Sequence, residues 1–226
     1  RSGRGLLVTI GLLVAAALGL TLRFGEPQDL TFGMLVALTG TVLLLLFPVL
    51  AILTVTAETS QRTALVTFTV EPRRLRVVAA KVVATTWWSA WLLGVAVLLG
   101  ALAHGLAVVT RDVPADWSPA WASLGGLALS LLLAVLQGIA FGLLLGSPAL
   151  AVSAYFVLPL GWAVVAGITP ALQRVAPWLD PTGSGEVLVR GTMQAQDWAH
   201  VATSNAVWVL LPLVVGLVVL DRREIS

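Results

Sequence analysis

The side chains best suited to chemistry in this sequence are charged, and they gather in one polar stretch, residues 57–81. The chain has 13 basic and 11 acidic residues, and 7 of these lie in the stretch. Charges of both signs in a chain that is otherwise largely apolar point to ion pairing and hydrogen bonding with a partner in water. Glu58 and Arg62 are four residues apart, so on a helix they would face each other and could pair. The seven are Glu58, Arg62, Glu71, Arg73, Arg74, Arg76 and Lys81.

Other reactive residue types form no motif. His104 and His200 are isolated, without a partner at ligand spacing, so we expect no metal site. The absence of cysteine excludes disulfides and cysteine-ligated metals. The sequence contains no G-x-S-x-G, no H-E-x-x-H and no paired-carboxylate cluster in its apolar runs, and we therefore expect no enzyme. The only lysine, Lys81, follows two alanines, so the chain lacks a phosphate-binding loop, and any ATP that drives it must bind another chain.

The elements that carry the polar stretch are predicted to be membrane helices. The chain is 58% hydrophobic and only 11% charged, and about 20 mostly apolar residues suffice to cross a bilayer. The net charge of +2 and the scattered basic residues argue against nucleic-acid binding. We predict an all-α, polytopic fold in one transmembrane domain over residues 1–226, with the first run retained as a helix. The six spans cover about 5–22, 31–56, 82–109, 120–145, 149–168 and 203–220.

The distribution of charge predicts the orientation. Nine of the 13 basic residues fall at the termini and in 57–81, on one side of a six-span layout, whereas seven of the 11 acidic residues fall on the other. Lysine and arginine are enriched in cytoplasmic loops. We therefore expect both termini and the 57–81 loop to be cytoplasmic. Residues 170–202 would face outward, with a short helix or two that dips toward the membrane.

Within the polar stretch, the local signals predict a short helix followed by a break. Residues 63–70 are moderately apolar, whereas Pro72 ends any helix and biases Glu71 toward extended geometry. Arg73 and Arg74 then begin a basic approach to the third span. From composition alone, an ordinary positive loop with an amphipathic surface helix explains the stretch equally well.

The order Glu58, Arg62-Thr63, Pro72-Arg73 and Lys81 resembles the cytoplasmic loop of ABC-2 type transporter permeases. The segment Trp208-Val-Leu-Leu-Pro212, then Gly216 and Arg222-Arg223-Glu224, is similar to the last helix and tail of that family. The six-span count and the long outward segment fit as well. The sequence departs from the pattern at Arg62, where the family often has glycine. This departure leaves the start of the short helix open.

The resemblance implies the transmembrane half of a bacterial plasma-membrane exporter that works by alternating access. The helix around 62–70 would be a coupling helix, seated in a cytoplasmic ATP-binding cassette subunit that carries ATP and Mg²⁺, with no cofactor in this chain. A second copy or a paralogue would complete the pathway for a hydrophobic or amphipathic substrate. The residues assigned to coupling are Glu58, Arg62, Thr63, Thr67, Glu71, Pro72 and Arg73.

Three alternatives stay open at this point. Glu58 could equally be an interfacial carboxylate solvated by headgroups and water. An ion-driven secondary transporter usually needs ionisable residues near mid-membrane or broken helices, and the prolines Pro48, Pro159 and Pro212 keep that class open. An intramembrane enzyme would need a buried polar cluster, which the spans do not offer.

Small and polar residues inside the spans suggest further roles. Gly138, Gly142 and Gly146 are four residues apart and predict a face for close helix packing. We favour packing within the chain over a dimer seam. Gln137 would line a polar path or bond a neighbouring backbone.

A tryptophan cluster lies near the start of the third span. Tryptophan is enriched at membrane interfaces, where one side of the indole is apolar and the other wet. The cluster could contact an amphipathic substrate, although anchoring in the inner leaflet is the favoured interpretation. Its members are Trp87, Trp88 and Trp91.

Overall fold

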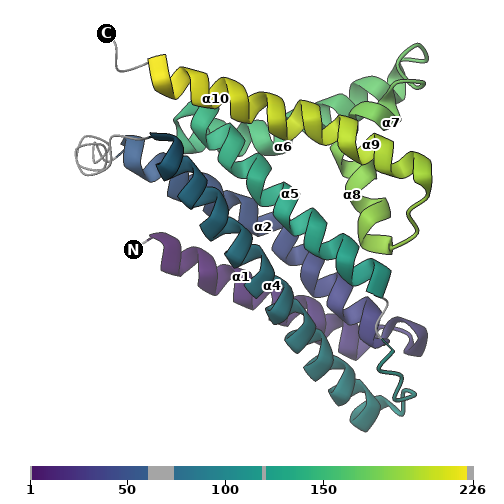
Figure 1. Cartoon of the computed structure of the whole chain (residues 1–226). Coiled ribbons are helices and arrows are strands. Elements are labelled where there is room, and N and C mark those ends of the chain that lie inside the picture. The colour runs from purple at the N-terminus through teal and green to yellow at the C-terminus, as the bar shows by residue number, and fades with distance from the viewer. Residues whose placement is uncertain (1, 61–73, 119–120, 223–226) are drawn as a thin grey trace.

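The structure is a computed structural model that describes residues 2–60, 74–118 and 121–222. Every regular element in these residues is helical, which confirms the predicted all-α class (Figure 1). The elements are α1 (Ser2–Phe24), η1 (Pro27–Asp29), α2 (Phe32–Ser60), α4 (Arg74–Arg111), α5 (Trp121–Leu145), α6 (Pro148–Ile168), α7 (Ala176–Leu179), α8 (Pro181–Arg190), α9 (Ala195–Asn205), the π-helix η2 (Ala206–Leu210) and α10 (Leu211–Arg222).

Six of these helices are long and apolar enough to cross a membrane. α4, with 38 residues, is about 57 Å long at 1.5 Å per residue, well beyond the roughly 30 Å of hydrocarbon. The spanning segments are Leu7–Phe24, Phe32–Ala57, Val82–Arg111, Trp121–Leu145, Pro148–Ile168 and Ala195–Val219.

The last of these segments begins earlier than the expected start at residue 203. The reason lies at Gln194, whose side chain accepts a bond from the backbone of Asp197 while the Asp197 carboxylate accepts one from the backbone of Gln194. This reciprocal capping box satisfies two backbone donors and starts a helix there. Hydropathy alone did not reveal this start, because the first turns of α9 are polar.

α9, η2 and α10 form one continuous helix with a wide turn in the middle. The backbone N–H of Leu211 donates to the carbonyl of Ala206, five residues earlier, which defines the π turn. Pro212 follows immediately and has no N–H to donate. A π turn at this place widens the helix and relieves the crowding that a proline ring imposes on the preceding turn.

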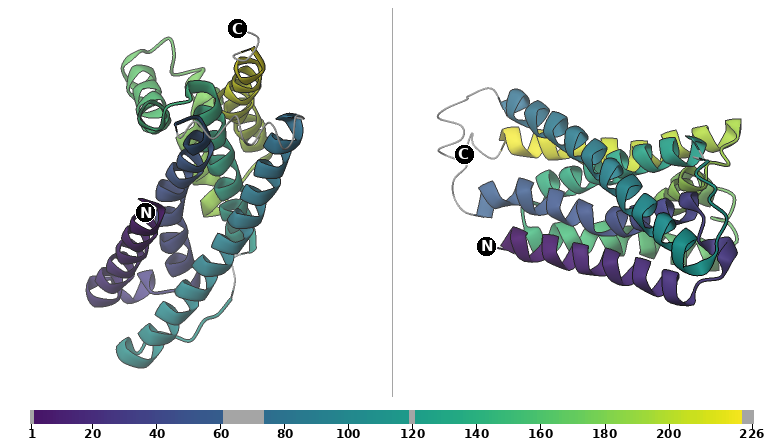
Figure 2. Two further views of the ribbon diagram at one scale, coloured as in Figure 1. Left: turned by 90° about the vertical axis from the view of Figure 1, so that its left-hand side faces the viewer. Right: turned by 90° about the horizontal axis from the view of Figure 1, so that it is seen from below.

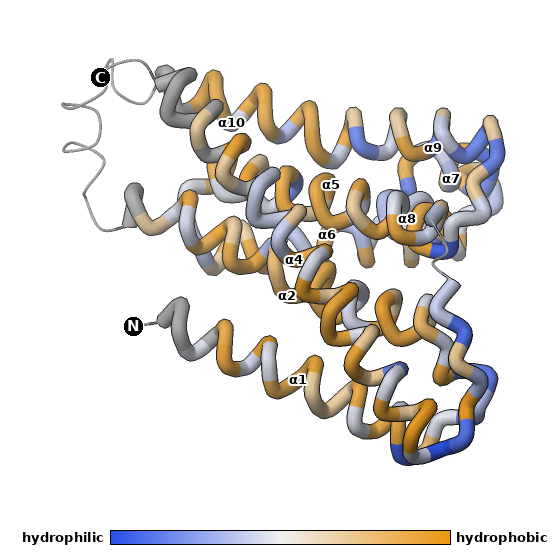
Figure 3. The backbone as a smooth tube through the Cα atoms, turned by 60° about the horizontal axis from the view of Figure 1, so that its bottom comes forward, coloured by the Kyte–Doolittle hydropathy of each residue, from blue (hydrophilic) through white to orange (hydrophobic). Residues whose placement is uncertain are grey.

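Both termini and the two ends that flank residues 61–73 lie at the same end of the bundle (Figures 1 and 2). We call this the terminal end. The opposite end carries η1, the 112–118 connection, α7 and α8, and hydrophilic residues gather there while the long helices are largely hydrophobic (Figure 3). The segments that flank residues 61–73 thus lie beside the termini, which is the arrangement that a six-span layout predicts.

α2 and α5 form the centre of the bundle. α2 packs against α1, α4, α5 and α6, whereas α5 packs against α2, α4, α6, α8 and α10. Glycines permit the closest approaches: a Cβ on Gly100 of α4 would lie 2.8 Å from the backbone nitrogen of Val36 on α2. Most of the buried apolar core surrounds α2 and α5, and it includes Leu35, Leu127 and Leu131.

Candidate functional site

Most of the predicted coupling residues lie outside the described part of the chain. Glu58 belongs to the last turn of α2, which continues to Ser60, and α4 begins at Arg74. The predicted coupling helix itself falls in residues 61–73, so it stays a prediction. The residues concerned are Arg62, Thr63, Thr67, Glu71, Pro72 and Arg73.

α2 leads directly from the bundle centre to this stretch. It runs from Phe32 to Ser60 with Pro48 in its interior. Proline removes one backbone hydrogen bond of a helix and crowds the preceding turn, so Pro48 marks the place where α2 bends most easily. A Cβ on Gly138 of α5 would lie 2.7 Å from the Pro48 carbonyl oxygen. The weakest turn of α2 therefore also lies in close contact with α5.

The three glycines predicted to form a packing face do not behave alike. Gly138 and Gly142 face α2 of the same chain, since a Cβ on Gly142 would lie 3.4 Å from the Cβ of Val55. Gly146 differs from the expectation because α5 ends at Leu145. With φ at 64°, Gly146 adopts the left-handed conformation that glycine accepts at no steric cost. It therefore forms the turn into α6 rather than a third step of the packing face.

The predicted tryptophan cluster lies on the outer surface of α4. Trp87, Trp88 and Trp91 are 75%, 51% and 56% exposed. The rings of Trp88 and Trp91 meet edge to face at 5.5 Å. These indoles do not line the interior of a single chain, so a contact with substrate would have to form on the surface of α4 or between two copies.

Gln137 is buried on α5, with 8% of its surface exposed. Its place on α5, beside Gly138, puts this amide on the buried side of the helix. Whether it lines a polar path or bonds a neighbouring backbone stays a prediction.

At the opposite end, two side chains of α4 hold the connection between α1 and α2. Arg111 donates to the carbonyls of Leu22, of Arg23 at 3.3 Å and of Gly25 at 3.1 Å. The last carbonyls of a helix lack intrahelical partners, and this guanidinium supplies them for α1. We did not predict this role of Arg111 from the sequence.

His104 supports the same connection from inside. Its ring is fully buried, and its Nδ1 lies 2.8 Å from the Leu30 carbonyl oxygen. A carbonyl can only accept, so Nδ1 carries the proton. The ring also meets the edge of Trp117 with centroids 4.8 Å apart. His104 and Arg111 are seven residues apart, which places both on one face of α4. This spacing was the signal in the sequence that could have revealed their shared role.

The 112–118 connection is held in place around Trp117. Asp116 accepts hydrogen bonds from the hydroxyl and the backbone N–H of Ser118. These bonds stabilise the carboxylate and lower the pKa of Asp116 below its ordinary value. The turn thus presents Trp117 to His104.

A polar pocket of about 700 Å³ lies between α6, α7, α8 and α9 at the same end. Its wall contains an indole, a histidine, an amide, a hydroxyl and two carboxylates. The nitrogens Trp162 Nε1 and His200 Nε2 are buried without a partner among the described residues. The polar residues in the wall are Trp162, Gln173, Asp180, Ser184, Asp197 and His200.

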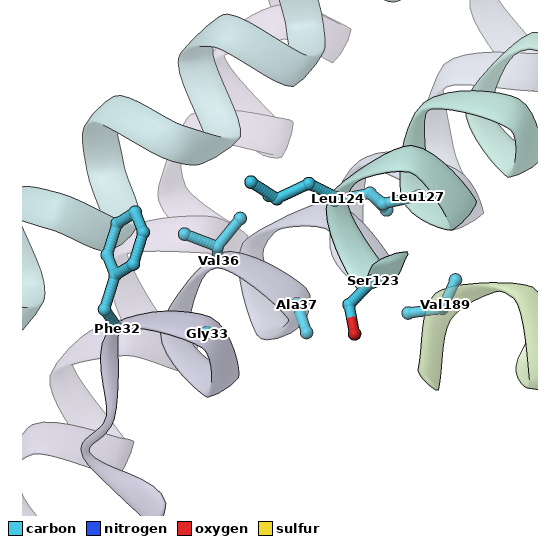
Figure 4. Close-up of a pocket in the computed structure, with 8 residues that line it drawn as sticks. All are labelled: Phe32, Gly33, Val36, Ala37, Ser123, Leu124, Leu127 and Val189. Atoms are coloured by element: carbon cyan, nitrogen blue, oxygen red, sulfur yellow. The ribbon is translucent and has the colours of Figure 1, made fainter. Parts of the chain in front are cut away.

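Two other hollows are apolar. A groove of about 580 Å³ lies between α2, α4 and α5, where Phe32, Val97 and Leu124 line it. Beside it, α2, α5 and α8 meet around a cleft of about 10 Å³ (Figure 4). That volume holds about one water molecule, so the cleft is a packing junction. Ser123 at its edge donates to the Arg190 carbonyl at 3.0 Å.

The described residues contain no candidate metal-binding site. Across residues 2–60, 74–118 and 121–222, no group of three histidine, aspartate or glutamate side chains is close enough to hold a metal ion. A comparison with family models, curated proteins and solved structures finds no match to this chain.

Proposed function

We propose that this chain is the transmembrane permease subunit of an ATP-driven transporter of the ABC-2 type. It would act in a bacterial plasma membrane and export a hydrophobic or amphipathic substrate by alternating access. A cytoplasmic ATP-binding cassette subunit would bind ATP and Mg²⁺, and a second copy or a paralogue of the chain would complete the pathway.

The observation that carries the proposal is the placement of the charged stretch relative to α2. Six apolar helices bring both termini and the flanks of residues 61–73 to one end of the bundle. At that end, α2 continues without interruption into the stretch whose residues resemble an ABC-2 coupling loop. A soluble motor bound there would act directly on the central helix.

The packing of α2 suggests how such a motor would reach the rest of the bundle. α2 contacts α5 closely at Gly138 and Gly142, and it contacts α4 closely at Gly100. Small residues at helix interfaces allow backbones to approach and transmit a displacement without slack. A push on the end of α2 would therefore move α5 and α4, with bending concentrated at Pro48.

The two apolar features of the bundle fit a hydrophobic cargo. The groove between α2, α4 and α5 is open to the surroundings and almost free of polar groups. The indoles Trp87, Trp88 and Trp91 add an exposed aromatic surface on α4. Substrate would bind where its affinity differs between the inward and outward states, because only differential binding shifts a conformational equilibrium.

The test is a mild-detergent purification of the chain from its native membrane, with mass spectrometry of the proteins that stay bound. We expect recovery of a soluble subunit that contains a phosphate-binding loop. Replacing residues 62–70 with a Gly/Ser linker of equal length should abolish that recovery, because it removes the predicted coupling helix while leaving all six spans unchanged.

The matched control changes charge at the opposite end. Glu186 and Arg190 form an exposed ion pair on α8, and the double variant E186Q/R190Q should retain the motor subunit fully. A well-folded preparation without any nucleotide-binding subunit would contradict the proposal. So would undiminished recovery with the 62–70 linker.

A further inference from the structure

We propose that the pocket between α6, α7, α8 and α9 binds an amphipathic organic cation. Residues of α7 and α8 line it, and these helices lie at the end of the bundle opposite the termini, away from the predicted motor site (Figure 1). The argument rests on its size, the hydrogen bonds that hold its walls, its unbalanced charge and its aromatic lining.

The pocket has the dimensions of a small-molecule site and fixed walls. Its volume of about 700 Å³ falls inside the range of about 300–1,000 Å³ typical of ligand sites. The hydroxyls of Ser184 and Ser204 lie 3.0 Å apart and join α8 to α9.

Two further bonds hold α7 in place. Thr203 donates to the Trp178 carbonyl at 3.0 Å, and Trp208 Nε1 donates to the Leu179 carbonyl at 2.7 Å. Both donors belong to the continuous helix formed by α9, η2 and α10. These bonds tie α7, α8 and α9 to one another, so three of the four elements around the pocket are held in place before a ligand binds.

The wall carries two formal negative charges and no lysine or arginine. Asp180 accepts a hydrogen bond from the Thr182 backbone through Oδ1, and Asp197 accepts one from the Gln194 backbone through Oδ2. Their other oxygens accept none from a described residue. Arg190, on the same helix α8, forms its ion pair with Glu186 outside the pocket. Asp180 and Asp197 therefore have no ion-pair partner among the described residues. An anion would be repelled here, whereas a cation would be attracted.

An organic cation fits better than a metal ion. No group of three acidic or histidine side chains in the described ranges is placed to hold a metal. The wall instead offers Trp162 and the apolar side chains Ala163, Ala166 and Val187. Indole faces attract cations through the ring quadrupole, and the apolar side chains would cover the uncharged part of the ligand.

Two ring nitrogens in the wall add capacity for polar substituents. Trp162 Nε1 and His200 Nε2 are buried without a partner in the described part of the chain. Buried polar groups in native proteins are nearly always hydrogen-bonded. A hydroxyl or carbonyl on the ligand would satisfy them after a small rotation of either ring. Calling this ligand a transported substrate rests on the proposed function, whereas the binding itself does not.

The test compares two probe ions of the same shape and opposite charge. The purified full chain in neutral detergent is dialysed to equilibrium against tetraphenylphosphonium or tetraphenylborate, with protein-free micelles as the blank. We expect saturable binding of the cation and none of the anion. The variant D180N/D197N keeps both helix caps, because asparagine also accepts the capping bonds, and should bind the cation at least about tenfold more weakly.

The control E186Q removes one negative charge from the same segment but outside the pocket, and should leave the Kd unchanged. Equal binding of both ions, absence of cation binding, or an unchanged Kd in D180N/D197N would overturn the proposal. Size-exclusion chromatography checks folding, and the single variants D180N and D197N repeat the test, each with a weaker Kd expected. The assay needs neither ATP nor a motor subunit, so its outcome is separate from that of the proposed function.

Discussion

α1 and α5 carry the same sequence pattern, but α5 is largely buried whereas α1 is largely exposed. Both are apolar helices with glycines at multiples of four residues, Gly11 and Gly19 on α1 and Gly138 and Gly142 on α5. In α5, 56% of the spanning window is buried, compared with 17% in α1. A Cβ on Gly11 or Gly19 would meet nothing within 4 Å, whereas α2 covers the α5 glycines. Small-residue spacing therefore creates a flat face but does not determine whether a helix covers it.

The two helices are consequently held by different means. α5 depends on close backbone approach along its length, to α2 at Gly138 and to α8 at Gly126. α1 contributes a narrow apolar edge that includes Ile10, and Arg111 binds the carbonyls at its C-terminal end. Adding one methyl group should thus destabilise the protein at the tightly covered glycines of α5 but not at the open glycines of α1.

The largest effect is expected for G126A. A Cβ at this position would lie 1.7 Å from the Leu188 carbonyl oxygen, so α8 must move away at a cost of about 3 kcal/mol. Thermal unfolding in detergent should show a clear loss of stability. G125A is the matched control, because a Cβ on Gly125 meets nothing within 4 Å. Equal stability of the two variants would show that α8 does not pack against α5 as described.

Removing the guanidinium tests the other means of attachment. R111A should lower the free energy of unfolding by about 2 kcal/mol, because hydrogen bonds to charged groups contribute roughly 1.5–3 kcal/mol. R111K keeps the charge but loses the forked geometry, so it should fall between R111A and the parent protein. Wild-type stability in R111A would mean that α1 is held by its apolar edge alone.

A smaller loss is expected for G138A, about 1–2 kcal/mol. Here the new Cβ would meet the Pro48 carbonyl oxygen at 2.7 Å. Part of the strain can relax, because proline makes this turn of α2 the easiest to bend. G142A is the neighbouring control, since its Cβ would lie at an ordinary contact distance of 3.4 Å. The same unfolding assay measures both, and a more stable G138A would contradict the close approach of α5 to α2.

The smallest changes are expected for G11A and G19A, and their sign should be reversed. With open space around each Cβ, the better helix propensity of alanine should stabilise α1 by up to about 0.5–1 kcal/mol. Self-association is measured alongside stability. Reduced self-association in G11A or G19A, with the monomer still folded, would identify α1 as a face that a second copy covers.

The sequence predicted the elements more fully than the contacts between them. Residue-level hydropathy located all six spans and the polar stretch at residues 57–81 between the second and third, and the structure places the flanks of residues 61–73 beside the termini (Figure 2). It did not predict that α8 folds back along α5, because the spacing of Gly126 shows that a neighbour can approach closely but not which element it is. It also placed Gly146 on the packing face, although that residue forms a left-handed turn.

What the sequence determined by itself is local: six apolar helices, a concentration of charge between the second and third, and the absence of a phosphate-binding loop. Helix formation and membrane crossing depend on properties of consecutive residues, so a single chain segment is enough to reveal them. Tertiary structure alone decided which glycines are covered, how Arg111 holds α1, and that Asp180 and Asp197 share a pocket with Trp162. These features depend on residues far apart in the chain, and only the packing of the helices brings them together.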